Sequence, residues 1–91
     1  MLEGFTPWPE ERARLYRERG YWEGVTIFEM VARTAARHPE KTALIAGERR
    51  IGYRELIDTA ERLAARFAEA GLRPLDRVVL QLPNTPDFAF V

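Results

Sequence analysis

The stretch YRELIDTAERLAARFAEAGLRPLDRVVLQL, residues 53–82, decides the fold class because two periodicities meet in it. Its first part places apolar residues at helical spacing and charged residues between them; the apolar set is Tyr53, Leu56, Ile57, Ala60, Leu63, Ala64, Phe67 and Ala68. Such a stripe predicts a long helix that buries one face. Gly71 then predicts a left-handed cap, and Pro74 prevents the helix from continuing.

After the cap, the run RVVLQL at residues 77–82 is almost unbroken in apolar character. This pattern predicts an interior parallel strand that is covered on both faces. One long helix does not cover both faces of a sheet. We therefore expect the remaining layers to come from further sequence or from another chain.

Upstream of the long helix, Thr26 and Glu29 stand in capping-box spacing and predict a second helix, which Pro39 ends. Residues 42–46 then predict a strand, Gly47 and Glu48 a turn, and residues 49–51 a short return strand. Helix, hairpin, long helix and strand in this order predict the opening of a layered α/β domain with right-handed crossovers.

Residues 1–24 form an arm with a short helix, which begins after Pro9 and ends at Gly20. The arm holds five of the ten aromatic residues: Phe5, Trp8, Tyr16, Tyr21 and Trp22. We expect these side chains to strap the arm onto a larger body; the alternative is a docking surface for a partner protein. Residues 25–91 are then the start of the α/β domain.

At the other end, Asn84 or Thr85 can cap a helix that has Pro86 at its first position. The sequence reaches Val91 before this helix completes two turns, and isolated helices below about 12 residues are marginal in water. We expect the chain to be the front piece of a longer protein, truncated at its C-terminus, and its exposed apolar faces to favour self-association.

Composition narrows the class of protein. Fourteen basic residues balance fourteen acidic ones, so no overall field attracts nucleic acid or an anionic membrane. The sequence carries no signal peptide and no membrane-spanning run, and it has no cysteine. We therefore expect a cytoplasmic protein that binds neither nucleic acid nor membrane.

No residue qualifies as catalytic, cofactor-binding or metal-ligating. The sequence has no glycine-rich phosphate loop, and it contains neither serine nor cysteine. Lys41 lies alone in a polar connection, and His38, the only histidine, precedes Pro39 where a helix C-terminus favours a cation. Neighbouring carboxylates lie on arginine-rich helical faces, where a solvated surface is the expected role; these are Glu10 with Glu11, and Glu55 with Asp58.

A resemblance adds what the residues alone do not supply. The opening FTPWPEERARLYRERGYWEG and the passages from His38 to Ile45, from Tyr53 to Leu56 and from Gly71 to Asn84 resemble the start of adenylate-forming enzymes. This superfamily contains acyl-CoA synthetases and nonribosomal-peptide adenylation domains. The aromatic arm resembles that of stand-alone ligases of siderophore biosynthesis, which activate 2,3-dihydroxybenzoate or salicylate.

The resemblance implies a large N-terminal α/β domain and a smaller mobile C-terminal domain. It implies that the parent enzyme uses ATP and magnesium to form an aryl-adenylate, then passes the acyl group to the phosphopantetheine thiol of an aryl carrier protein. The family's phosphate loop, aryl pocket, hinge aspartate and catalytic lysine have no counterpart in this sequence, so no role is carried over. Gly52 stands where the family commonly has threonine or serine, which predicts a weaker helix cap.

The chain itself is thus expected to be inactive scaffold, with the remainder of its own large domain as its first partner. Two alternatives stay open from the sequence. One is a piece of an acyl-CoA or fatty-acid ligase, and the other is a small independent protein-interaction module.

Overall fold

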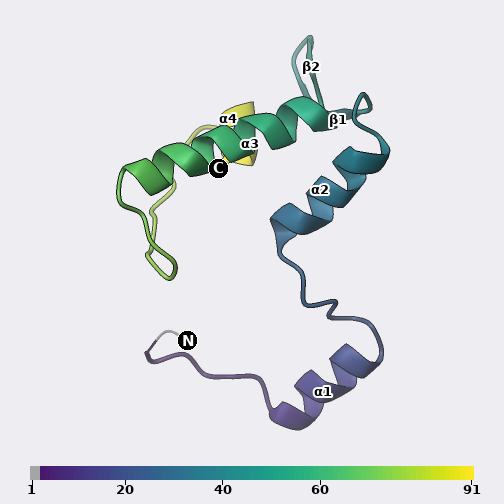
Figure 1. Cartoon of the computed structure of the whole chain (residues 1–91), viewed down its shortest axis with the longest axis vertical. Helices are drawn as coiled ribbons and strands as arrows, with labels where there is room; N and C mark the ends of the chain where they lie inside the picture. Colours follow the sequence, from purple (N-terminus) through teal and green to yellow (C-terminus); the bar gives the residue numbers. More distant parts are fainter. Residues whose placement is uncertain (1–2) are drawn as a thin grey trace.

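The computed structural model describes residues 3–91, and it contains helices and a small sheet in the order that the sequence predicts. The elements are α1 (Glu10–Glu18), α2 (Ile27–Arg37), β1 (Thr42–Ala46), β2 (Arg49–Gly52), α3 (Tyr53–Glu69) and α4 (Pro86–Phe90). Helix α3 contacts α2, α4 and both strands (Figure 1). We call residues 25–91 the body and residues 3–24 the arm.

Strands β1 and β2 form an antiparallel hairpin that turns at Gly47, whose φ of 62° suits glycine. Leu44 pairs with Ile51 and Ile45 pairs with Arg50, and an irregularity in register precedes Leu44. Ile51 is fully buried at the base of the hairpin, whereas Ile45 on the opposite strand is 65% exposed. The hairpin therefore buries one side and leaves the other open.

Helix α3 begins without a side-chain cap because its N-cap residue is Gly52. Main-chain carbonyls serve as the cap instead, since the N–H of Tyr53 donates to Lys41 at 3.0 Å and the N–H of Arg54 donates to Pro39 at 3.0 Å. The first orphan donors of the helix are thus satisfied. Carbonyls of the passage that leaves α2 thus take the place of a side-chain cap.

The end of α3 follows the predicted left-handed cap. Gly71 has a φ of 97°, its N–H donates to Ala68, and the N–H of Leu72 donates to Phe67, both at 3.0 Å. This is a Schellman motif. The next turn places Leu75 at a φ of 72°, a conformation that a leucine rarely adopts, and closes with the Asp76 N–H donating to Arg73 at 3.1 Å.

The predicted strand at residues 77–82 does not form in this structure. Between Arg77 and Leu82 the backbone is irregular, and Val79 is 93% exposed. A helix closes its hydrogen bonds within itself, but a strand exists only where a second strand pairs with it. Within residues 3–91 nothing pairs with this segment, because the sheet there consists of β1 and β2.

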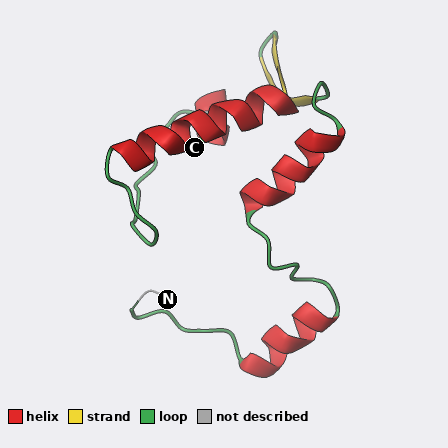
Figure 2. Ribbon diagram, viewed as in Figure 1, coloured by secondary structure: helices red, strands yellow, loops and turns green. Residues whose placement is uncertain are grey.

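The molecule is open. Its radius of gyration is 16.5 Å, against about 12 Å for a compact domain of this length. Its accessible surface is 8133 Å², against roughly 5,400 Å² for a compact protein of 10.5 kDa. A loop carries the chain from α1 to α2, and α1 stands away from the body (Figures 1 and 2). The start of the arm lies nearer the body, since Glu3 and Gly4 line one hollow together with Leu75, Asp76 and Arg77. Much apolar surface consequently faces solvent.

Candidate docking face

An apolar groove runs along α3. Its lining residues come from the start of α2, one side of α3 and the end of the chain: Phe28, Ala60, Glu61, Leu63, Ala64, Phe67, Phe90 and Val91. The groove has a volume of about 410 Å³. Most of these α3 residues belong to the apolar stripe that the sequence predicts to be buried.

The stripe is only partly covered. Helix α3 has no fully buried residue, and Leu56, Ile57, Leu63 and Phe67 are half-buried. Helix α2 and the short α4 contact α3 and cover part of it. The layer that would bury the stripe completely is not supplied within residues 3–91, which fits the large accessible surface of the molecule.

The two phenylalanines of helix α4 differ in burial. Phe90 is buried and lines hollows on both sides of the contact with α3, whereas Phe88 is more than half exposed. The start of this helix matches the sequence prediction, with Thr85 at the N-cap and Pro86 in its first turn, although the Thr85 side chain makes no capping hydrogen bond. One aromatic ring of this short helix is thus buried, and the other faces solvent.

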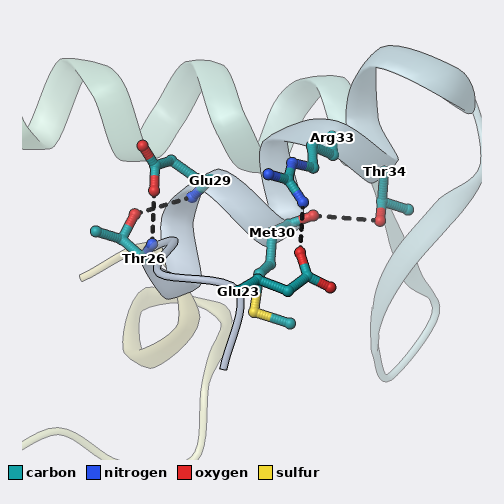
Figure 3. Close-up of polar contacts among 6 residues, drawn as sticks. All are labelled: Glu23, Thr26, Glu29, Met30, Arg33 and Thr34. Atoms are coloured by element: carbon teal, nitrogen blue, oxygen red, sulfur yellow. Dashed lines mark hydrogen bonds and ion pairs between the residues drawn. The ribbon is translucent and has the colours of Figure 1, made fainter. Parts of the chain in front are cut away.

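Polar contacts fix the entry to α2 (Figure 3). The Glu29 carboxylate accepts a hydrogen bond from the Thr26 N–H at 2.6 Å, and the Thr26 hydroxyl accepts one from the Glu29 N–H at 3.1 Å. These bonds to Thr26, with a further contribution from Arg33, lower the pKa of Glu29. Arg33 also pairs with Glu23 at 2.8 Å, which ties the end of the arm to α2. The capping box that the sequence predicts is confirmed.

In the arm the aromatic side chains pack on one another. The ring of Tyr16 lies 6.2 Å from Trp8, 5.2 Å from Trp22 and 6.1 Å from Tyr21, measured between centroids. Trp8 and Trp22 are 5.6 Å apart, and the Arg17 guanidinium lies 5.9 Å over Trp22. Sequence reasoning missed this cluster. Its signal was the placement of aromatic residues just before, within and just after one short helix that ends at a glycine.

The residues that the sequence singled out lie apart from one another and take structural places. His38 is the C-cap of α2, and its N–H donates to Thr34 at 2.9 Å. Lys41 is exposed, and its N–H donates to His38 at 3.1 Å. Glu55 pairs with Arg49 at 2.7 Å across a solvated surface. None of these geometries places a base beside a nucleophile.

The described part of the chain holds no group of three His, Asp or Glu residues arranged to bind a metal ion. In the same part, every helix is too short or too polar to cross a lipid bilayer. The described residues thus offer three surfaces: the apolar groove on the body, the unpaired segment from Arg77 to Leu82, and the aromatic cluster on the arm. Such surfaces offer packing area to other protein, and the assignment of no catalytic residue stays a prediction.

Comparison with known proteins gives these surfaces their context. The family model described as AMP-binding enzyme matches residues 31–91. The 2,3-dihydroxybenzoate-AMP ligase of Bacillus subtilis (strain 168) is 46% identical over 88 residues. The salicyl-AMP ligase / salicyl-S-ArCP synthetase of Mycobacterium tuberculosis is 43% identical over 93 residues. Each alignment covers 97% of this chain and 16% of the relative.

The solved apo structure of MbtA from Mycobacterium smegmatis matches with a TM-score of 0.84 and 50% sequence identity, over 96% of this chain and 16% of that one. The chain therefore has the fold of an α/β segment of an adenylate-forming enzyme. It belongs to the AMP-binding enzyme family. It spans about one sixth of the length of the relatives it matches.

Proposed function

We propose that this chain is the N-terminal structural part of an ATP-dependent aryl-acid adenylating ligase. One observation carries the proposal: the alignment with the 2,3-dihydroxybenzoate-AMP ligase extends over 97% of the chain, and so includes most of the aromatic arm as well as the body. The family model itself begins at residue 31, within α2. The arm thus extends the likeness beyond the family model and toward relatives that adenylate aryl acids.

The open surface supports a scaffold role. The accessible area exceeds that of a compact protein of this mass by roughly 2,700 Å². Obligate interfaces bury about 2,000 to 5,000 Å² or more in total, which is about 1,000 to 2,500 Å² or more on each partner. The excess on this chain is thus as large as the surface that one partner buries in a large permanent interface, and we assign the other side to the remainder of the large domain.

The reaction we propose for the whole enzyme has two steps. An aryl carboxylate oxygen attacks the α-phosphorus of ATP, the new O–P bond forms as the bond to pyrophosphate breaks, and an aryl-adenylate results. A phosphopantetheine thiol, that of an aryl carrier protein, then attacks the acyl carbon and expels AMP. Adenylation makes AMP the leaving group, and the enzyme holds two anions together and stabilises the developing charge.

We propose that this chain makes no contact with ATP, magnesium or aryl acid in the whole enzyme. The proposal is supported by the groove on α3, which is lined mainly by apolar side chains. The chain contributes helices α2 and α3, the hairpin and the unpaired segment as packing surfaces, and we place the enzyme in the cytoplasm.

Aryl-acid-dependent exchange of pyrophosphate into ATP tests the proposal, measured on the whole protein encoded by the gene. We expect exchange with 2,3-dihydroxybenzoate or salicylate, and much less with benzoate or a fatty acid. A preference for fatty acids would replace the proposal by an acyl-CoA or fatty-acid ligase. The 91-residue chain by itself should give no exchange, and a magnesium-dependent ATP complex of that chain would contradict its role as scaffold.

A further inference from the structure

We propose that residues 8–22 form a preassembled aromatic clasp, whose order is set within the arm and does not depend on the body. The clasp comprises Trp8, helix α1 and the two aromatic residues that follow Gly20. A nine-residue helix is too short to be stable by itself in water, so contacts outside the helix must hold it. The structure supplies those contacts from the arm alone.

Backbone hydrogen bonds close the C-terminal end of α1 within the arm. Gly20 has a φ of 74°, and its N–H donates to Arg17 at 3.1 Å. The carbonyl of Tyr16 accepts from the N–H of Tyr21 at 2.9 Å and from that of Trp22 at 3.3 Å. This is a Schellman motif, which commonly includes an apolar contact between the two residues that Tyr16 and Tyr21 represent here. Their ring centroids lie 6.1 Å apart, so that contact is present.

The side chains then enclose Tyr16. Trp8 meets it with an interplanar angle of 75° and Trp22 with one of 62°, both edge-to-face arrangements. Trp8 and Trp22 also meet each other at 74°. Edge-to-face pairs are stabilised by the ring quadrupole in addition to burial, and the Arg17 guanidinium over Trp22 adds a cation–π contact. Every one of these partners lies between residues 8 and 22.

The arm meets the body outside residues 8–22, where Glu3 and Gly4 line a surface hollow with Leu75, Asp76 and Arg77. Helix α1 stands apart from α2, α3 and α4, joined to them by a loop (Figure 1). The ion pair between Glu23 and Arg33 links arm and body, but each side chain is 55% exposed, and exposed pairs contribute little in water. The clasp is therefore ordered by its own contacts, with the rings of Trp8 and Tyr21 more than half exposed on it.

Both tryptophans of the chain lie in the clasp, which makes the proposal testable on the full 91-residue chain. Urea unfolding is followed by tryptophan emission and near-ultraviolet circular dichroism for the clasp, and by amide hydrogen exchange of α2 and α3 for the body. We expect the two transitions to fall at different urea concentrations. Coincident transitions would overturn the proposal, because they indicate a single cooperative unit.

Variants separate the two units further. In Ile51→Asp, which places a charge at a fully buried site of the body, we expect hydrogen-exchange protection of α2 and α3 to fall while the near-ultraviolet signal of the tryptophans stays. In Tyr16→Ala we expect the reverse. Phe5→Ala is the matched control, an exposed arm aromatic that lies outside the ring pairs of the clasp, and should change neither signal. Loss of the tryptophan signal in Ile51→Asp would contradict the proposal.

Discussion

Thr26 and Glu29 cap each other: the Thr26 N–H donates to the Glu29 carboxylate at 2.6 Å, and the Glu29 N–H donates to the Thr26 hydroxyl at 3.1 Å. Two donors that α2 would otherwise leave unsatisfied are thereby bonded within four residues of sequence. The entry to α2 is consequently fixed by local chemistry alone. Apart from the pair between Arg33 and Glu23, the packing of α2 depends mainly on α3, which lies farther along the chain.

Removing the threonine side of this pair should weaken α2. We expect Thr26→Ala to lower the free energy of unfolding by about 1 kcal/mol. Thr34→Ala is the matched control, since the Thr34 hydroxyl donates only to the Met30 carbonyl of its own helix, at 3.4 Å. Such a back-bond adds little, so the control should be neutral or slightly stabilising. Urea unfolding followed at 222 nm measures the free energy of unfolding of both variants. Equal losses in the two would contradict a stabilising cap at Thr26.

The carboxylate side of the pair gives α2 a dependence on pH. The hydrogen bonds from Thr26, and then Arg33, hold the pKa of Glu29 below its ordinary value in the folded chain. A lowered folded pKa means that this contribution to stability is present above the unfolded pKa and is lost as pH falls through the folded pKa. Glu29→Gln should lack that acid-side loss. The carboxyl chemical shift of Glu29, titrated by NMR, measures the pKa directly, and a value at or above that of a free peptide would refute it.

Helices and hairpin could be predicted from sequence because each is encoded locally. The capping box at Thr26, the turn at Gly47 and the left-handed Gly71 all act within a few residues, and all three are confirmed. The apolar pattern from Arg77 to Leu82 predicts a strand, and here the prediction was wrong, because pairing requires a distant strand. The positive φ of Leu75 also escaped prediction, since nothing about leucine signals it.

The candidate docking face could be predicted from sequence only in part, because only its local features are encoded within a few residues. The stripe on α3 could be predicted from its spacing, but its partners could not, since they depend on which elements reach it in space. That the aromatic residues of the arm strap it to a larger body stays a prediction; the packing of Tyr16 and its neighbours on each other was not predicted. Aromatic residues close in sequence around a glycine turn are the signal for such a cluster.

The hairpin offers a sharp test of where the core lies. Ile51 is fully buried and Ile45 is 65% exposed, although both are isoleucines of one two-stranded sheet. We expect Ile51→Ala to destabilise the body by about 2 to 4 kcal/mol, because it removes buried methyl groups and leaves a cavity. Ile45→Ala should change stability by less than about 0.5 kcal/mol. Hydrogen-exchange protection of β1 and of the first turn of α3 measures the loss of stability in both variants. Similar losses would contradict the placement of Ile51, and not Ile45, in the core.

The turn after α3 should be selective for residue type at Leu75, which has a φ of 72° and is 65% exposed. Glycine adopts this conformation without strain, so we expect Leu75→Gly to be tolerated. A β-branched residue does not, and Leu75→Val should be less stable than the glycine variant by about 1 kcal/mol. Leu72→Val supplies a control on the same turn, where φ is not positive. Exchange of the Asp76 N–H, which donates to Arg73, follows the turn directly.

The unpaired segment should make the chain associate with itself. Val79 is 93% exposed in a run that has strong strand character, and unpaired strands of this kind attract one another. We expect sedimentation to show a concentration-dependent increase in mass, and Val79→Lys to shift the chain toward monomer, because a charge at this position opposes strand pairing. Ala65→Lys adds the same charge at an exposed position on α3 and should leave association unchanged. If both variants reduce association equally, the change in net charge is responsible and not the segment. If the unsubstituted chain stays monomeric at all concentrations, its exposed apolar surfaces do not bind a second copy of the chain.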